Sequence, residues 1–459
     1  MNMIKNNALE ERIGKKEIFA FGCGEVSTNI LFAVTTVLLT FFYTDVIGVS
    51  AATVGLIIGV SQIFNGISDV AAGIIIDRTR SKYGKSRSWM LYMSVPYAIS
   101  FVLLMTVPKV GEYAQAIYIF ITYNLLMTVV YTMLYLAFTT LYTFMTRDQG
   151  ERAKLTVVRM TMSPIANIAV TMTFLKIVNS FGGDQAAWIK VTAIYALIAC
   201  LLMLFSFFHT KERVDVKDDL GDNKLPVKTA LKVLGQNKYF IMLAIFFIIL
   251  AHYMTFRGTM LMYCCKYILG NEEMMGTINM ASQVTMIIFI PLVGLLAKKI
   301  KKRDLCIGGG GIIIVGSLMV YFSPANVPLV FAGSLLQGIG ASPAYALIFV
   351  MIADSNEYGH WKTGIRTPGV IQSAASCGQK FGSGAGSAII GAIMAASGYN
   401  GLAAAQTPKA NATIVGLYTF GLAFFGLAMI VVLLFYKLDS EYPAVMDELL
   451  RRESAMNAA

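Results

Sequence analysis

Twelve predominantly apolar stretches, each about 20 residues or longer, follow one another along this chain of 459 residues. About 20 apolar residues in a helix span the hydrocarbon core of a bilayer. Because lipid cannot satisfy backbone hydrogen bonds, such stretches must be helical in a membrane. We therefore expect an all-α integral membrane protein with spans at 17–45, 52–76, 88–108, 113–145, 153–179, 186–209, 238–268, 274–298, 304–323, 327–352, 369–396 and 411–437.

A long hydrophilic segment after the sixth span divides the chain into six spans and six. We predict an N-terminal six-helix bundle at 1–209, a cytoplasmic linker at 210–237, and a C-terminal six-helix bundle with a short cytoplasmic tail at 238–459. Only 14% of the residues are charged and 56% are hydrophobic. A soluble domain carries roughly 25% charged residues, so this composition excludes a soluble fold.

The net charge of +11 reflects the positions of the loops rather than a nucleic-acid partner. Alternate loops, both tails and the linker hold 29 of the 37 lysines and arginines. Cytoplasmic loops carry this excess in membrane proteins. We therefore expect both termini and the linker in the cytoplasm, in a multi-pass protein of the plasma or inner membrane. The basic residues form no extended arm of the kind that binds nucleic acid.

The two halves repeat a glycine spacing. Gly55 and Gly73 are 18 residues apart in the second span, and Gly276 and Gly294 are 18 apart in the eighth. Each pair runs into a basic turn. A chain of six and six spans with repeated halves is the organisation of major-facilitator transporters, which bind substrate near the midplane. We expect the major facilitator fold.

Three blocks of sequence are more specific: FFYTDVIGVS at 41–50 with the following Gly55, D-x-x-x-G-x-x-x-DRTRSKYGKSRSW at 69–89, and ADSNEYGHWKTGIR at 353–366, followed by GQKFG at 378–382. The chain resembles the glycoside–pentoside–hexuronide:cation symporter family, the melibiose-carrier branch of the major facilitators. The resemblance runs through the whole chain in order. It implies symport of a sugar with a monovalent cation by alternating access.

The cation site is predicted on the second span, where Asn65, Ser68 and Asp69 share one helical face. The resemblance implies that this face carries the coupling cation, with acids at two positions four residues apart and a hydroxyl from Thr132. Here Asn65 occupies the first acidic position, which leaves Asp69 as the acid. Sodium gains from two negative charges, whereas a single carboxylate can take up and release a proton. We favour H+ slightly and keep Na+ open, as we do a purely structural role for Asp69.

The resemblance also implies a sugar site between the halves. Asn29 and Tyr135 stand where the family has sugar-binding acids, and Thr139 stands where it has a stacking tryptophan. The two basic residues that the family carries in this site are present here as Arg159 and Lys380. The remaining predicted substrate-binding residues are Tyr131, Arg159, Tyr345 and Lys380.

Two charged residues are additional features of this chain. Glu25 lies one turn before Asn29 and is expected on the same face. Arg257 lies within the seventh span, where an arginine needs an anion or strong acceptors. It pairs with Glu25 or Asp69, or it meets an anionic group of the substrate. A neutral glycoside is the default, and a hexuronide or another acidic sugar is the alternative.

A cytoplasmic gate is predicted where the second span ends. Gly73 is expected to let a neighbouring helix pack closely, and Asp77 and Arg78 begin the basic loop. Charges at helix ends can form pairs that break and re-form. The partners expected from the 354–366 loop are Asp354, Glu357, Lys362 and Arg366. The basic turn can alternatively serve only to set the topology.

Other signals in the sequence are weak. Gly84-Lys85-Ser86 lacks the upstream glycine of a phosphate-binding loop. The glycine run 308–311 favours close packing over a nucleotide site. The six cysteines have no zinc-site spacing. We expect no catalytic site, no metal and no organic cofactor, and a monomer. The alternatives to a sugar symporter are a carrier of lipid-like amphiphiles on the same scaffold and a solute sensor that does not transport.

Overall fold

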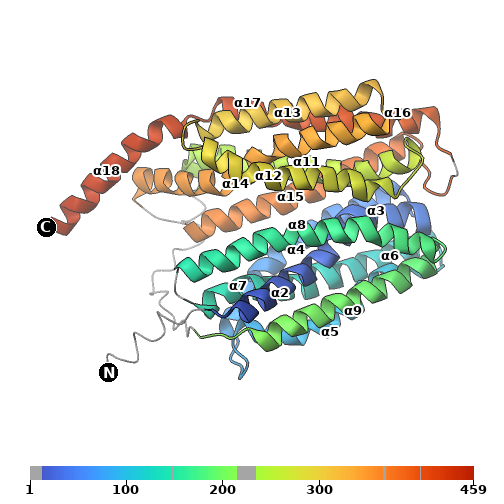
Figure 1. The fold of residues 1–459 in the computed structure, drawn as a ribbon, viewed down its shortest axis with the longest axis horizontal. Coiled ribbons are helices and arrows are strands. Elements are labelled where there is room, and N and C mark those ends of the chain that lie inside the picture. Colours follow the sequence, from blue (N-terminus) through green and yellow to red (C-terminus); the bar gives the residue numbers. More distant parts are fainter. Residues whose placement is uncertain (1–12, 147–148, 214–233, 365–367, 404, 459) are drawn as a thin grey trace. The chain divides into compact units, whose positions relative to one another are not determined.

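The computed structural model describes residues 13–146, 149–213, 234–364, 368–403 and 405–458, and every regular element in these ranges is a helix (Figure 1). Eleven helices of the described chain are long and apolar enough to cross a membrane. The predicted span 369–396 coincides with a further helix, α15 (Pro368–Ala396). The chain forms two compact units.

Unit 1 contains residues 1–219 and two short segments, Glu272–Gly276 and Ala388–Thr407. Its first span runs through α2 (Lys15–Ala33), π-helical η1 (Val34–Leu38), α3 (Leu39–Phe41) and π-helical η2 (Phe42–Ile47). The fourth span likewise contains a π-helical segment. The other elements are α4 (Ala51–Arg78), α5 (Ser86–Met105), α6 (Glu112–Asn124), η3 (Leu125–Tyr131), α7 (Thr132–Met145), α8 (Gln149–Ser180) and α9 (Gln185–His209).

Unit 2 contains residues 220–271, 277–387 and 408–459. Helices α12 and α15 begin or end in the short segments that belong to unit 1. Its elements are α11 (Lys238–Tyr267), α12 (Met274–Leu296), α13 (Lys302–Phe322), α14 (Val327–Thr363), α15, α16 (Pro408–Gly416), η4 (Leu417–Gly421), α17 (Leu422–Leu434) and α18 (Leu438–Ala458).

The expected loop at 354–366 is wrong as far as Thr363. Helix α14 continues eleven residues beyond the predicted end of its span and stops at Gly364, whose φ of 70° places it in the left-handed region. Glycine adopts this conformation without a steric penalty and commonly ends a helix. The indole Nε1 of Trp361 donates to Glu448 of α18, and Arg452 of α18 donates to the carbonyl of Trp361. These contacts with the C-terminal helix accompany the extension.

Two glycines of the run 308–311, Gly309 and Gly310, pack closely against neighbouring helices, as expected. A Cβ added to Gly309 of α13 would stand 2.4 Å from the backbone oxygen of Gly340 of α14. One added to Gly310 would stand 2.8 Å from a side-chain carbon of Ile430 of α17. Small residues let membrane helices approach until their backbones touch. The run therefore places α13 against both neighbours in unit 2.

Candidate functional site

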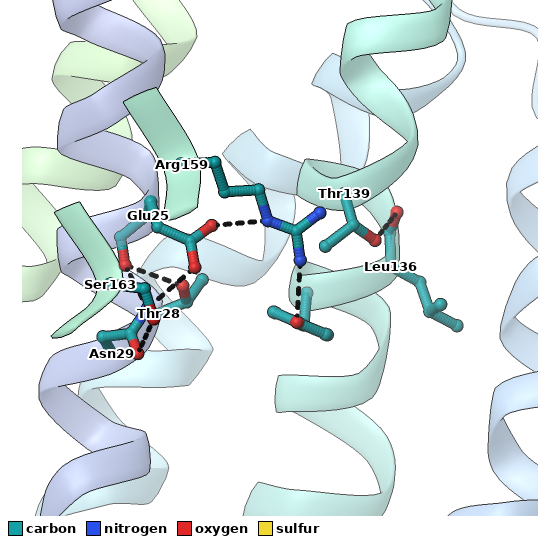
Figure 2. Close-up of polar contacts among 8 residues, drawn as sticks. Glu25, Thr28, Asn29, Leu136, Thr139, Arg159 and Ser163 are labelled. Carbon is teal, nitrogen blue, oxygen red and sulfur yellow. Dashed lines mark hydrogen bonds and ion pairs between the residues drawn. The ribbon is translucent and has the colours of Figure 1, made fainter. Parts of the chain in front are cut away.

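All but one of the predicted sugar-binding residues of unit 1 form one hydrogen-bonded network (Figure 2), and Tyr131 joins it by stacking. The guanidinium Nε of Arg159, on α8, donates to the Glu25 carboxylate on α2 over 2.9 Å. The Glu25 side chain retains only 4% of its exposure, and that of Arg159 retains 20%. The pair joins helices that are 134 residues apart in sequence. Glu25 therefore supplies an acid to this side of the site one turn before the position held by Asn29.

Asn29 is bonded on both of its polar atoms. Its amide nitrogen donates to the second carboxylate oxygen of Glu25 over 2.9 Å, as the one-turn spacing on α2 allows. Its carbonyl accepts from the hydroxyl of Ser163 on α8 over 2.8 Å. Both carboxylate oxygens of Glu25 are thus engaged within unit 1. Ser163 lies one turn after Arg159, so the 3.6-residue period of a helix is the sequence signal that could have identified it.

Aromatic rings extend this network along the fourth span. Arg159 donates to the hydroxyl of Tyr135 over 2.9 Å. The Tyr135 ring stacks on that of Tyr131, with centroids 5.4 Å apart and an interplanar angle of 11°. Tyr97 of α5 stacks on Tyr131 in turn, at 6.4 Å. Fixed polar groups beside aromatic faces are the usual lining of a small-molecule site, and they suit sugar hydroxyls and pyranose faces.

The face that carries the predicted cation site packs against η3. Asn65 is buried, and its carbonyl lies 2.5 Å from the hydroxyl of Thr128. The same hydroxyl lies 2.9 Å from the carbonyl of Asn124, whose amide donates to Ser61 of α4. Thr128 and Asn124 were not among the predicted residues. They precede Thr132 by one and two turns, so periodicity could have placed them on its face.

Two hydroxyls predicted to assist the cation are also engaged as donors. Ser68 donates to the backbone carbonyl of Thr128. Thr132 donates to the carbonyl of Met127 over 3.0 Å, five residues earlier, which is the spacing of a π-helix. Single π-helical turns occur often at functional sites. Each hydroxyl keeps lone pairs, so these bonds alone do not remove them as ligands.

Asp69 belongs to the helical face of unit 1 that carries the predicted cation site. It lies on α4 and is half-buried. Its charge acts on the hydroxyl of Tyr135, the same group that Arg159 bonds. An electrostatic effect of this kind means that a change of charge at Asp69 is felt by the sugar-binding network.

Unit 2 holds the other three predicted substrate residues. Arg257 of α11 is buried, and one of its terminal nitrogens donates to the Asn279 carbonyl of α12 over 3.3 Å. Its charge acts on Tyr345 of α14. Lys380 lies on α15 and is half-buried.

The residues predicted for the gate differ in their surroundings. Gly73 does not accommodate a close neighbour as expected, because among the described residues nothing lies within 4 Å of a Cβ added there. A close approach occurs instead near Gly55, where a Cβ added to Gly391 would stand 3.0 Å from the Gly55 Cα. Arg78 is exposed at the end of α4. The side chain of Asp77 lies outside the described part of the structure.

The gate partners expected at 354–366 have contacts inside unit 2. Asp354 pairs with Lys302 at the start of α13. Lys362 donates to the carbonyl of Gln236 over 2.9 Å. Glu357 is half-buried on α14, and Arg366 lies outside the described residues. A gating role for these residues stays a prediction.

The basic turn after α4 binds a carboxylate of its own chain, which the sequence analysis did not predict. The Glu212 carboxylate accepts the backbone N–H groups of Lys85, Ser86 and Arg87, each over 2.8 Å. Gly84 precedes them with a φ of 103°, and a Cβ there would stand 2.4 Å from Glu212. The N-terminus of a helix favours an anion at this position. The turn thus anchors the start of the linker to α5.

The comparisons with known proteins agree with this architecture. A family model described as MFS/sugar transport protein matches residues 20–440. The isoprimeverose transporter of Lactiplantibacillus pentosus is 31% identical over 448 residues, covering 96% of this chain and 92% of that protein. A putative glycoside/cation symporter of Escherichia coli (strain K12) is 26% identical, covering 97% and 96% of the two chains.

The fold is shared with solved transporter structures. The crystal structure of a D-xylose-proton symporter aligns with a TM-score of 0.68 at 13% identity, covering 92% of this chain and 97% of that one. At that identity the likeness concerns the fold, and it agrees with the predicted major facilitator architecture. The family model and the full-length relatives show that this chain belongs to the MFS/sugar transport proteins, in the glycoside–pentoside–hexuronide:cation symporter family.

Proposed function

We propose that the protein imports a glycoside or a related sugar together with a monovalent cation, by alternating access. The observation that carries this proposal is the network of Glu25, Asn29, Arg159 and Tyr135, with Tyr131 stacked beside it. It offers hydroxyl, amide and charged partners next to an aromatic face. The isoprimeverose transporter and the putative glycoside/cation symporter support a sugar as the transported solute.

The proposed coupling runs through Asp69. When a cation binds there, the negative charge that acts on Tyr135 is neutralised. The Tyr135 hydroxyl also accepts from Arg159, which holds Glu25. Cation binding would therefore change the electrostatic environment of three sugar-binding groups. Coupling of two ligands requires that each changes the affinity for the other, and this path supplies a means.

Protons are the preferred coupling ion in this proposal. Where the family has a second acid, this chain has Asn65, whose carbonyl is close to the Thr128 hydroxyl. Sodium is held by several oxygen ligands and gains from two carboxylates, whereas a proton needs one. The direction of transport, the identity of the sugar and the cytoplasmic position of both termini belong to the proposal as well.

Transport by purified protein in liposomes tests the proposal. A panel of neutral and acidic glycosides is measured for counterflow and for uptake driven by a pH gradient or by a sodium gradient. We expect uptake of at least one glycoside to follow the pH gradient. The Asp69→Asn variant should keep counterflow, which needs no net cation movement, and lose concentrative uptake.

Three results would contradict parts of this proposal. If Asp69→Asn concentrates sugar with the parent's cation dependence, Asp69 is not the coupling site. If a sodium gradient alone drives uptake, the preference for protons is wrong. If no glycoside shows counterflow, the sugar assignment fails, and exchange of a fluorescent lysophospholipid would then identify a carrier of amphiphiles.

A further inference from the structure

Arg257 carries two nitrogen atoms with no hydrogen-bond partner in the part of the chain that the structure describes. The residue is 6% exposed, and its Nε and one terminal nitrogen, Nη2, are both buried without an acceptor. The third nitrogen, Nη1, donates to the neutral Asn279 over 3.3 Å. Among the described residues no carboxylate forms an ion pair with this guanidinium.

Such a site is costly unless something neutralises it. A buried charge without a partner loses its hydration and gains nothing in return. Ionisable groups inside membrane proteins that persist in this state commonly face a substrate or ion pathway. A neutral amide at 3.3 Å offers one weak bond to a group that has five N–H donors. The cost therefore favours an anionic ligand at this position.

The free edge of the guanidinium indicates the shape of this ligand. Nε and Nη2 lie on the same side of the planar group and donate in parallel. This edge matches the two oxygens of a carboxylate in a bidentate pair. A neutral hydroxyl could satisfy one of the two nitrogens but not the charge.

Three tyrosines of unit 2 lie close enough to Arg257 for its charge to act on them. Tyr253 lies one turn before Arg257 on α11, and its buried hydroxyl is also without a hydrogen-bond partner among the described residues. The charge of Arg257 acts on this hydroxyl and on those of Tyr345 and Tyr418. Tyr418 faces the hydroxyl of Ser334 at 3.2 Å. Tyr345 is 38% exposed, whereas Arg257 is 6% exposed.

We propose that Arg257, through its Nε–Nη2 edge and with Tyr253 one helical turn before it on α11, binds the carboxylate of an acidic glycoside. This inference rests on the proposed function, since it assigns the substrate class of the same transporter. The carboxylate of a sugar acid can accept from both nitrogens of this edge within unit 2. A neutral glycoside leaves the two nitrogens unpaired and binds more weakly.

Two matched sugars and a set of variants test this assignment. Methyl β-D-glucuronide and methyl β-D-glucoside differ only in the carboxylate or hydroxymethyl group at C6. Their apparent affinities are measured by counterflow in liposomes for the parent and for Arg257→Gln, Arg257→Lys and Tyr253→Phe. Lys176→Gln, which removes an exposed cation from α8, is the matched control.

The parent should bind the glucuronide about tenfold or more tightly than the glucoside, because hydrogen bonds to a charged group carry this much energy. Arg257→Gln should bring the ratio of the two affinities close to one, chiefly by weakening the binding of the glucuronide. Arg257→Lys should lower the ratio partly, since an ammonium is a point charge without the bidentate edge. Tyr253→Phe should also lower it partly, and the control should keep the parental ratio.

The assignment is wrong if the parent prefers the glucoside, or if Arg257→Gln keeps the parental ratio. It is also wrong if the protein does not exchange the glucuronide and added acetate, a free carboxylate, raises exchange of the glucoside. If Arg257→Gln aggregates on size-exclusion chromatography, Arg257→Lys and Tyr253→Phe decide, and unchanged ratios in both overturn the assignment. If the protein exchanges the glucoside but not the glucuronide, the assignment of Arg257 is wrong and the proposed sugar symport is not contradicted. If it exchanges no glycoside in the panel, both proposals are wrong.

Discussion

Replacing Glu25 with glutamine should destabilise the protein by about 3 kcal/mol, because it leaves the Arg159 guanidinium without its counter-charge. Removing one partner of a buried ion pair costs about 3–5 kcal/mol. The Arg159 side chain keeps 20% of its exposure, so water can solvate it in part and the lower end of that range applies. Arg159→Gln should cost about 4 kcal/mol, since the Glu25 side chain that it strands is only 4% exposed.

The double variant separates the pair from its two members. With both charges gone, neither side chain is stranded, and the loss should be smaller than the sum of the single losses by about 2–3 kcal/mol. The measurement is the free energy of unfolding in mixed micelles titrated with SDS, for the parent, both single variants and the double variant. Sugar exchange should fall more than tenfold in every variant, because the site needs the charged groups as well as the fold.

The control is a second ion pair of the same chain. Lys238 of α11 and Glu441 of α18 lie 4.0 Å apart, with 52% and 42% of their side chains exposed. The same four-protein cycle on this pair should give a coupling of about 0.5 kcal/mol or less. If the Glu25–Arg159 coupling is no larger than that of the control, the two residues do not act as a buried pair and the reasoning fails.

Three further predictions concern contacts elsewhere in unit 1. Glu212→Gln weakens the capping of α5 by a carboxylate that accepts three backbone N–H groups. The free energy of unfolding in the same SDS titration should fall by about 1.5–3 kcal/mol, and an unchanged value would contradict the anchor. Asn65→Asp restores the second acid that the family carries, so uptake should become sodium-stimulated, and a sodium titration of uptake that stays flat would argue against a cation site at this face. Tyr399→Phe removes the 2.5 Å hydrogen bond from its hydroxyl to Asp45 and should lower stability by about 1.5–3 kcal/mol in the same SDS titration, while a change under 0.5 kcal/mol would mean that Asp45 is satisfied without it.

The spans could be predicted from the sequence because the bilayer imposes a local rule. Every backbone group must be satisfied inside the segment, so length and apolar composition alone identify the helices. The predicted ends mostly agree with the structure to within a few residues. The exception is α14, where the predicted end at 352 falls eleven residues short. Beyond the membrane, hydropathy no longer reports on helicity, and the contacts of Trp361 with α18 could not be seen in the sequence.

The site was partly predictable for the same local reason. The period of a helix placed Glu25 beside Asn29, and the structure confirms this with a direct hydrogen bond. Periodicity cannot say which residue of another helix completes the site. That Arg159 takes the Glu25 carboxylate, and that Thr128 takes the Asn65 carbonyl, depends on how α2 meets α8 and α4 meets η3.

The basic turn at 84–87 shows most clearly what the sequence alone predicts and what only the tertiary structure decides. The sequence by itself determined that this chain is a membrane protein of a sugar–cation symporter family, because hydropathy and motif spacing are properties of single segments. The turn at 84–87 carried such a motif, yet its binding partner, Glu212, lies more than 120 residues away. Only the packing of the helices brings that carboxylate to three backbone N–H groups. Which charges pair and which stay open, as at Arg257, is likewise decided by the tertiary structure, since electrostatic and hydrogen-bond energies depend on distance in space.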